Sequence, residues 1–425
     1  MHPISICCCR AVQLGFRAAM PFLPYRKPEI FDSVQALPAL LKGLDISAVL
    51  LITDKSLREA GITRTLEIIL QESGVRCPVF DGTCPNPTVD NVEEARQLYL
   101  REGCQALIAF GGGSSMDCAK AVGARIAYPR RSVNQMRGLL RVLRRIPTLI
   151  AIPTTAGTGS EVTITAVITD SQAKHKYTMN NFTMIPRYAV LDPAVTHSLP
   201  PSLTASTGMD ALTHAVEAYI GQSTTRETRQ LSLETVRLVF TYLERAYRDG
   251  NDDQARREML RAAHLAGLAF SKSYVGYVHA VAHSLGGQYN IPHGLANSVL
   301  LPIVLEAYGP SAWKKLRELA VAAGVSSGAD SPRQAAEAFI AAIRAMNRRM
   351  GIPETLPGIL AEDIPAMARH ASREANPLYP VPRLMDAGEL AKFYLKVSDS
   401  AAQVGKSQDL PSIRDGHGSA GRLSA

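Results

Sequence analysis

Three of the chain's ten histidines fall within the nineteen residues 276–294, GYVHAVAHSLGGQYNIPHG. His279 and His283 are four residues apart, so on a helix both rings leave the same face, one turn apart. His293 follows a Gly-Gly pair and a proline that end such a helix, and a turn there can bring its ring back towards the other two. The stretch therefore gathers several imidazoles at one place.

A second segment offers ligand atoms at the same spacing. In 207–215, TGMDALTHA, Asp210 and His214 are again four residues apart. A single histidine on an apolar face is more often a core residue than a ligand. A set of imidazoles with a carboxylate and no cysteine is instead typical of a divalent first-row metal such as iron or zinc, and it argues against a structural zinc knuckle. The two segments side by side predict a four-ligand metal centre, and the spacing does not decide between His279 and His283.

A glycine-rich turn suggests a bound anion. Residues 111–117, GGGSSMD, follow an apolar strand and precede a helix, where backbone amides can approach a phosphate and the helix N-terminus adds partial positive charge. The dinucleotide fingerprint GxGxxG is absent, and Asp54, the candidate ribose acid, lies on an earlier strand rather than after the glycines. A second loop at 152–163, IPTTAGTGSEVT, has hydroxyls and glycines suited to ribose and phosphate oxygens.

The segments GMDALTHAVEAY and GYVHAVAHSLGGQYNIPHG closely resemble the two signature segments of the iron-containing (group III) alcohol dehydrogenases, and the resemblance runs from about residue 21 to about residue 397. It implies that the ligands of Fe(2+), with Zn(2+) as an alternative, are Asp210, His214, His279 and His293. It also implies that His283 is no ligand but lies near the nicotinamide and substrate. There His283 would relay the proton, and the alternative is a residue that only packs on the cofactor.

The resemblance also implies which residues contact NAD. The GGGS turn would hold the pyrophosphate, and Asp54 would bind the ribose 2′-hydroxyl and repel a 2′-phosphate, which favours NAD over NADP. Taken alone, Asp54 could be only a helix N-terminal residue, Asn86 only a turn residue and Lys176 only a solvated lysine. The implied cofactor contacts are Asp54, Asn86, Gly112, Gly113, Ser114, Ser115, Asp117, Thr154, Thr155, Thr158, Thr163 and Lys176.

Phe270 and Val275 match pocket residues of the family, which implies an apolar pocket for short-chain primary alcohols. The expected activity is therefore a metal-dependent hydride transfer between NAD(H) and a primary alcohol or aldehyde. A polyol dehydrogenase of the glycerol type and a hydroxyacid–oxoacid transhydrogenase are alternatives. A carbon–oxygen lyase of the dehydroquinate synthase type, also dependent on NAD and a metal, is a remote alternative, because it would need phosphate-binding residues around the metal that 276–287 does not supply beyond its histidines.

Two kinds of periodicity position these residues. Up to about residue 200, short apolar runs such as 48–53, 106–110 and 148–152 alternate with helical segments, and one of these helices is expected at 56–72. Helical periodicity dominates from 203 to 396. The fold class is an α/β N-terminal dinucleotide-binding domain with a parallel sheet, Rossmann-like without GxGxxG, followed by an all-α C-terminal metal-binding domain. The expected boundaries are a disordered extension at 1–20, the α/β domain at 21–200, the helical domain at 201–397 and a disordered tail at 398–425.

Composition excludes several classes of protein. The formal net charge is +8, but a basic cluster in 130–145 has no interleaved aromatic residues, so we expect no nucleic acid partner and a solvated loop or helix face there. No apolar stretch reaches eighteen residues, so we expect no membrane partner. Seven cysteines without paired spacing fit a reducing, cytoplasmic compartment, although residues 1–20 also fit a weak organellar presequence. The family resemblance suggests a homodimer or a higher homo-oligomer.

Overall fold

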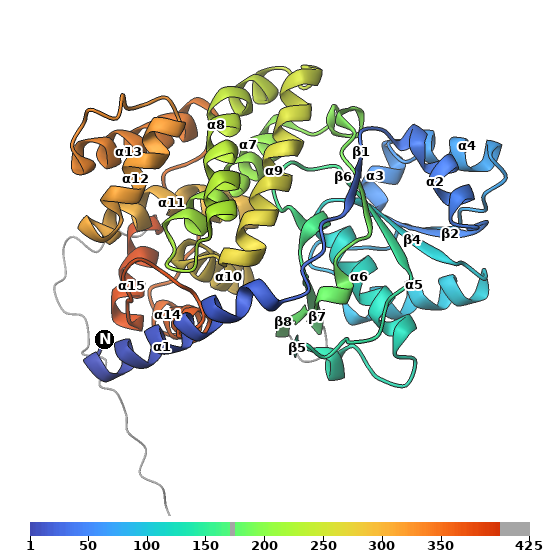
Figure 1. Ribbon diagram of the computed structural model, residues 1–425, viewed down its shortest axis with the longest axis horizontal. Coiled ribbons are helices and arrows are strands. Elements are labelled where there is room, and N and C mark those ends of the chain that lie inside the picture. Colours follow the sequence, from blue (N-terminus) through green and yellow to red (C-terminus); the bar gives the residue numbers. More distant parts are fainter. Residues whose placement is uncertain (171–174, 400–425) are drawn as a thin grey trace, which may run out of the picture.

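The structure, a computed structural model, describes residues 1–170 and 175–399. An α/β part and an all-helical part lie side by side, with helix α7 (Pro201–Ile220) opening the helical part (Figure 1). This is the two-part architecture expected from the periodicity. None of the helices in the described ranges is both long and apolar enough to cross a membrane.

A six-stranded parallel sheet forms the centre of the α/β part. Its inner strands read VLLI, ALIAFG and TLIAIP, and they are buried almost throughout, as expected where helices cover both faces of a parallel sheet. In spatial order the strands are β1 (Glu29–Phe31), β9 (Tyr188–Val190), β6 (Thr148–Pro153), β4 (Ala106–Gly111), β2 (Val49–Ile52) and β3 (Val79–Phe80).

Helices pack on both faces of this sheet through two separate apolar clusters. The prediction of a single helix at 56–72 was wrong, because Gly61 adopts a φ of +73° and divides this segment into α3 and α4. The helices of this part are α2 (Leu37–Gly43), α3 (Lys55–Glu59), α4 (Arg64–Glu72), α5 (Val89–Arg101) and α6 (Gly113–Ala127).

A smaller three-stranded sheet lies beside α6, in the order β5 (Gly138–Leu139), β8 (His175–Asn180), β7 (Thr165–Asp170). Short 3-10 turns connect the elements: η1 (Met20–Phe22), η2 (Val34–Ala36), η3 (Asn134–Met136), η4 (Ser160–Val162), η5 (Phe182–Met184) and η6 (Pro193–Thr196). Turn η4 ends the hydroxyl-rich loop, so it belongs to the site rather than to a strand.

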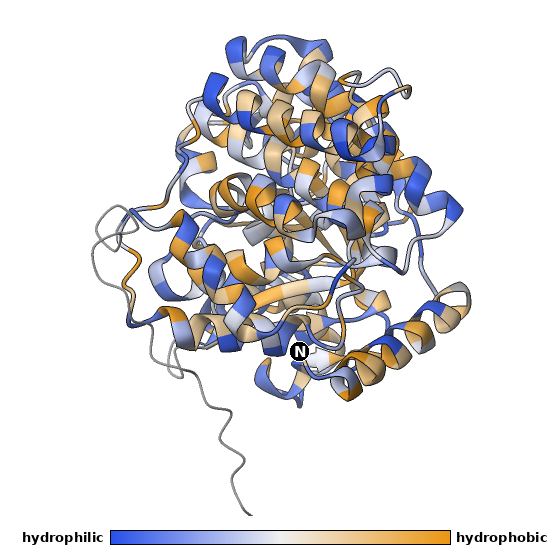
Figure 2. Cartoon of the chain, turned by 90° about the vertical axis from the view of Figure 1, so that its left-hand side faces the viewer, coloured by the Kyte–Doolittle hydropathy of each residue, from blue (hydrophilic) through white to orange (hydrophobic). Residues whose placement is uncertain are grey.

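Residues 1–20 are not the disordered extension that we expected, because Pro3–Ala19 form helix α1. Its inward stripe includes Cys9 and Gln13, spaced one turn apart, and both are buried. Gln13 Nε2 donates to the carbonyls of Pro377 and Tyr379 at 3.0 and 2.8 Å. Figure 2 shows hydrophobic residues along the rest of α1, at the lower right. Of the expected tail, residues 400–425 lie outside the described residues.

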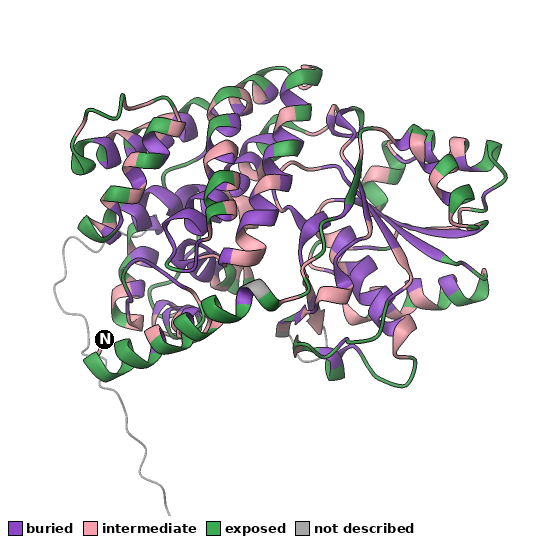
Figure 3. Cartoon of the chain, viewed as in Figure 1, coloured by how far each residue is buried: buried purple, intermediate pink, exposed green. Residues whose placement is uncertain are grey.

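The helical part buries its centre almost completely (Figure 3). Helices α7, α10 and α11 form this core, and α8 and α9 are long amphipathic helices beside α7. The remaining bounds are α8 (Arg226–Arg248), α9 (Asp253–Ser273), α10 (Tyr277–Tyr289), α11 (His293–Tyr308), α12 (Pro310–Ala322), α13 (Pro332–Arg349), α14 (Ile364–Ala375) and α15 (Ala387–Val397).

Lys120 on α6 ties the η4 loop to the small sheet. Its ammonium, fully buried, donates to Ser160 Oγ at 2.9 Å, Thr163 Oγ1 at 2.8 Å and the carbonyl of Thr165 at 2.8 Å. Burial lowers the pKa of Lys120 to about 8, against the opposing effect of Asp117. Three hydrogen-bond acceptors therefore replace the water that the buried ammonium of Lys120 loses.

Replacing Lys120 by Met should lower the free energy of unfolding by about 3 kcal/mol, because three buried acceptors lose their donor. The Lys55→Met variant is a matched control, since that side chain is 78% exposed and forms only a surface ion pair with Glu59. Denaturant titrations of both variants measure the difference. Equal midpoints for the two variants would contradict the structural role of the network.

Candidate active site

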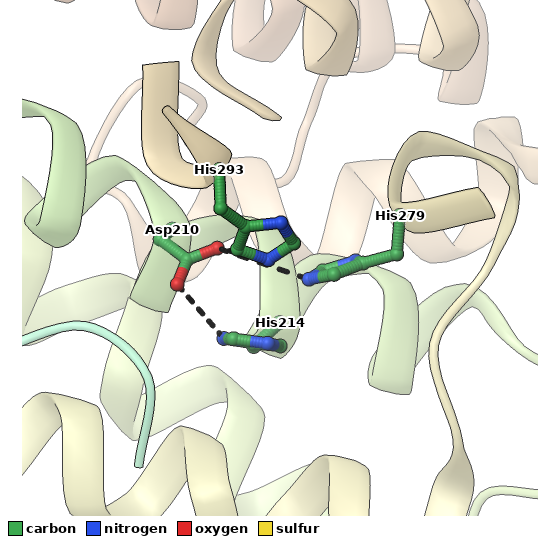
Figure 4. Close-up of side chains that lie close together, drawn as sticks. All are labelled: Asp210, His214, His279 and His293. Atoms are coloured by element: carbon green, nitrogen blue, oxygen red, sulfur yellow. Dashed lines mark ion pairs between the residues drawn. The ribbon is translucent and has the colours of Figure 1, made fainter. Parts of the chain in front are cut away.

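Asp210, His214, His279 and His293 point at one another (Figure 4), and one ligand atom from each lies within 4.8 Å of the others. Asp210 Oδ1 is 3.5 Å from His293 Nε2 and 3.8 Å from His279 Nε2, and Oδ2 is 3.9 Å from His214 Nδ1. Residues from three helices thus converge on one point. This is the arrangement expected from the two histidine-containing segments.

Local structure explains the convergence. Asp210 and His214 leave the same face of α7, and His279 lies in the first turn of α10. Asn290 ends α10 in the left-handed conformation, and His293 begins α11 directly after Pro292. The turn between α10 and α11 therefore returns His293 to the other ligands.

The four residues fit a divalent metal ion. Nδ1 of His214 and Nε2 of His279 are buried without a hydrogen-bond partner in the described part of the chain. Burial of two such acceptors is costly unless a ligand compensates it. Nitrogen and carboxylate oxygen donors together, without thiolates, suit iron or zinc in a reactive site.

The protonation states also favour metal binding. Burial lowers the pKa of His214, and burial together with the neighbouring imidazoles lowers that of His279 well below its usual value. Burial lowers the pKa of His293 to about 4, with Asp210 opposing the shift. All three rings are therefore neutral near pH 7 and keep a lone pair for an ion.

Two residues that support the ligands were not recognised from the sequence. Glu217, two turns after Asp210 on α7, lies with Oε2 2.6 Å from His279 Nδ1, and it accepts the N–H groups of Gly276 and Val278 at 2.7 and 2.8 Å. Burial raises the pKa of Glu217 to about 7, and the backbone donors oppose this. The spacing of seven residues from Asp210 was the available signal, because it places Glu217 on the same helix face.

Asn297, one turn after His293 on α11, is the second of these residues. Its Nδ2 donates to Asp210 Oδ1 at 2.7 Å and lies 3.1 Å from His293 Nε2. The side chain is fully buried. It therefore fixes the carboxylate that the three imidazoles face.

His283 lies beside the four residues but is not one of them. Its ring stacks on that of His293 at 5.2 Å, and its Nδ1 is 2.6 Å from Glu374 Oε1 on α14. The Tyr379 hydroxyl donates to the same oxygen at 2.7 Å. Burial lowers the pKa of His283, but the charge and hydrogen bond of Glu374 outweigh burial and raise it overall. A chain of three titratable groups thus leads away from the metal ligands.

The glycine-rich turn and the hydroxyl-rich loop face each other at the carboxyl ends of β4 and β6. A Cβ added to Gly112 would lie 3.5 Å from Thr155, and one added to Gly113 would lie 3.1 Å from Thr158. Helix α6 begins at Gly113, so its first amides are free for an anion. Gly112, Gly113, Ser114, Ser115, Thr155 and Thr158 therefore form a cradle, with Thr154 buried at its base.

The same loop reaches the metal ligands. A Cβ on Gly157 would lie 2.6 Å from the carbonyl oxygen of Thr207 on α7, one turn before Asp210. A Cβ on Gly159 would lie 2.7 Å from the Cα of Gly267 on α9. Glycine at these positions allows the two domains to approach closely, so the cradle and the ligands become neighbours.

Three other expected cofactor contacts come from separate elements of the α/β part. Asp54 caps α3, and its Oδ1 accepts the Leu57 N–H at 3.0 Å. Asp54 is therefore a helix N-terminal residue, and this bond does not use its second carboxylate oxygen. Asn86 donates to Asn290 Oδ1 at 3.3 Å, across the two domains. Lys176 on β8 is half-buried, and burial lowers its pKa.

Two expected contacts have other partners. Asp117 accepts hydrogen bonds from Ser160 Oγ at 3.1 Å and from the N–H of Val167 at 3.0 Å, and burial raises its pKa to about 6. The Thr163 hydroxyl is buried and accepts from Lys120. Both side chains therefore have partners within the protein, and their contacts with the cofactor stay predictions.

The expected pocket residues lie at the end of α9 and just after it. The ring of Phe270 stacks on that of His214, with centroids 4.1 Å apart and an angle of 15° between planes. Val275 is half-buried and directly precedes Gly276, the N-cap residue of α10. Phe270 therefore supplies an apolar wall directly against His214, one of the four residues that fit a metal ion.

Replacing Glu217 by Gln should weaken metal binding about 10- to 100-fold, because the oriented imidazole of His279 loses its anionic partner. Chelator competition on the purified protein measures this affinity without any activity assay. Glu161→Gln is a matched control, since that carboxylate is equally buried but faces His264 instead of the ligands. Unchanged affinity in Glu217→Gln would show that Glu217 does not support the metal.

Comparison with known proteins gives the family. The model described as "Iron-containing alcohol dehydrogenase" matches residues 30–193, and the "Fe-containing alcohol dehydrogenase family, C-terminal" model matches residues 204–397. The 1,3-propanediol dehydrogenase of Klebsiella pneumoniae is 38% identical over 81% of this chain and 90% of its own length. The lactaldehyde reductase of Escherichia coli (strain K12) is 36% identical over 80% of this chain and 89% of its own.

Solved structures agree with this relationship. A crystal structure of a 1,3-propanediol oxidoreductase superimposes with a TM-score of 0.84 at 35% identity, covering 88% of this chain and 99% of that one. The alcohol dehydrogenase from Oenococcus oeni gives a TM-score of 0.83 at 32% identity, covering 88% and 100%. The two matched models together span most of both domains, and the chain belongs to the iron-containing alcohol dehydrogenase family.

Proposed function

We propose that this chain catalyses the reversible, NAD-dependent oxidation of a short-chain primary alcohol to an aldehyde. The observation that carries the proposal is the contact between the two halves of the site. Gly157, in the loop that forms the cofactor cradle, packs against Thr207 of α7, one turn before Asp210, which is one of four residues that fit a metal ion. A nicotinamide held by the cradle would therefore lie beside the metal ligands.

Each group of residues has a separate task. The cradle at Gly112, Gly113 and α6 would bind the pyrophosphate, and Asp54 the adenosine ribose. Phe270 would exclude water beside the reacting carbon. Fe(2+) or Zn(2+) held by the four ligands would supply Lewis-acid polarisation of the alcohol oxygen.

The reaction leaves one proton to be placed. A hydride passes from the alcohol carbon to NAD⁺, the hydroxyl proton is released, and the products are an aldehyde, NADH and a proton. His283 is the residue that would receive this proton, because it lies beside His293 and is paired with Glu374. Glu374 keeps the ring oriented and stabilises its charged form.

A polyol substrate is the second candidate. Two relatives are named for 1,3-propanediol and lactaldehyde, which carry a second oxygen. The hydroxyl of Tyr379 and the ring of His283 are polar groups on the same side as the exposed ligand His293. They would give a second hydroxyl a partner. We further propose a cytoplasmic homodimer, and the seven free thiols support the reducing compartment.

The activity can be tested by oxidation of NADH across a panel of aldehydes, including propanal and lactaldehyde. The protein is first stripped of metal and then loaded anaerobically with Fe(II) or Zn(II). We expect activity only after loading, and none in the Asp210→Ala variant, whose metal content is measured in parallel. Absence of aldehyde reduction in the fully loaded protein would overturn the proposal.

The role of Glu374 can be separated from that of the metal. Glu374→Gln keeps the size of the side chain but removes its charge, so alcohol oxidation should slow by about 10- to 100-fold while the metal content stays the same. His283→Ala should have a similar effect, because both act on one proton. The control Glu318→Gln changes a carboxylate on α12 that contacts Tyr219 instead. A normal rate in both Glu374→Gln and His283→Ala would exclude the relay.

A further inference from the structure

The segment between α6 and β6, residues 128–146, carries a concentration of positive charge that the catalytic site does not use. We refer to it as the arginine loop. No acidic residue occurs from 128 to 160. All six arginines of the loop are exposed: Arg130, Arg131, Arg137, Arg141, Arg144 and Arg145.

These charges are not neutralised by neighbours. None of the six arginines forms an ion pair within residues 1–170 and 175–399, whereas exposed Arg245 and Arg257 of the helical part pair with Asp252 and Asp253 at 2.9 and 3.1 Å. The guanidinium groups of two of them, at 131 and 144, lie 4.8 and 5.0 Å from the centre of the ring of Tyr128. They are therefore held at the surface with their charge available.

More basic residues adjoin the loop. Burial lowers the pKa of Arg26, and the charges of Arg187 and Arg145 lower it further. Three separate segments of the chain thus contribute to one positive surface. The carboxylate of Asp170, at the end of β7, accepts a hydrogen bond from Asn134 of the loop at 2.7 Å.

Large apolar side chains point outward among the arginines. Leu139, Leu140 and Leu143 are 50%, 43% and 70% exposed. The loop is nevertheless anchored, because Val133, Met136, Val142 and Ile146 are buried in the apolar cluster beneath α5 and α6. The exposed leucines therefore lie on a segment whose other apolar side chains are packed in the core.

We infer that the arginine loop is a docking surface for a membrane that contains anionic phospholipid. Arginine binds phosphate and carboxylate headgroups through paired N–H groups, and leucines can enter the boundary between headgroups and acyl chains. A nucleic acid surface would instead present several aromatic rings for stacking, whereas the single aromatic residue in 128–146, Tyr128, already has Arg131 and Arg144 over its ring. We expected no membrane partner because no apolar span exists, but a surface loop of this kind needs no span.

Helix α1 supports the same assignment. It runs along the lower edge of the molecule in Figure 1, the edge at which β5 of the arginine loop also lies. Its outward side exposes Ile4 and Leu14, and α1 has no acidic residue. This edge therefore combines apolar and basic side chains, as expected of a face that meets anionic lipid.

The test is sedimentation of the full-length protein with vesicles of phosphatidylcholine alone or of phosphatidylcholine mixed with phosphatidylserine. We expect binding only to the mixed vesicles, and weaker binding as salt rises. Each basic residue near an anionic surface strengthens binding by roughly fivefold. The combined Arg137→Gln, Arg141→Gln, Arg144→Gln and Arg145→Gln variant should therefore bind about 600-fold more weakly.

A matched control removes four charges elsewhere, through Arg245→Gln, Arg257→Gln, Arg261→Gln and Arg333→Gln, and should bind mixed vesicles almost as the parent does. Leu139→Ser with Leu143→Ser should weaken binding but keep its salt dependence, whereas Leu360→Ser should not weaken it. Thermal unfolding and aldehyde reduction are measured on every variant, and we expect both to be unchanged in the loop variants.

Four results would overturn the inference. The first is absence of binding to the mixed vesicles, and the second is binding that the four-arginine loop variant retains in full. The third is binding to single-stranded RNA, but not to vesicles, that the loop variant loses, because this would assign the surface to nucleic acid. A loop variant that changes only the oligomeric state, with vesicle binding intact, would also contradict it.

Discussion

The buried carboxylate of Glu217 is the interaction on which the site depends. It connects α7 to the start of α10 by accepting the N–H groups of Gly276 and Val278, and it pairs with His279 Nδ1. A charge at this depth is stable only with several donors, and here they come from the backbone that must hold a metal ligand. The same contacts therefore satisfy the carboxylate, cap an orphan helix N-terminus and orient His279 towards Asp210.

The second constraint is the close contact between domains. The loop after β6 carries glycines that touch α7 and α9, and Lys120 fixes its other end from below. Lys120 thus holds the loop on the side of the sheet, and the loop packs against α7 and α9 on the side of the helices. The proposed cofactor cradle would therefore keep a fixed position relative to the metal-site residues, as hydride transfer requires, because a small displacement of the reacting atoms greatly slows such a reaction.

Sequence reasoning was sufficient where spacing encodes geometry. The i, i+4 pair on α7 and the turn before His293 predicted converging ligands, and alternating apolar runs predicted the parallel sheet. It failed where partners are distant in sequence: Glu374 is ninety-one residues from His283, and no local pattern joins them. Asp117 and Thr163 lie in cofactor-like motifs, but burial directs their side chains to Ser160, Val167 and Lys120. Helix α1 was missed because its partners, at 377–382, lie at the far end of the chain.

Exposure indicates how a substrate reaches the ligands. The side chains of Asp210, His214 and His279 are at most 6% exposed, whereas those of His293 and His283 are 39% and 42% exposed. An alcohol must therefore approach over these two rings, where Glu374 and Tyr379 also lie. The backbone of Tyr379 is held by Gln13 of α1, and its hydroxyl is bonded to Glu374. Because each contact in this series fixes the next, the N-terminal helix contributes to the orientation of His283 although it is far from the metal ligands in sequence.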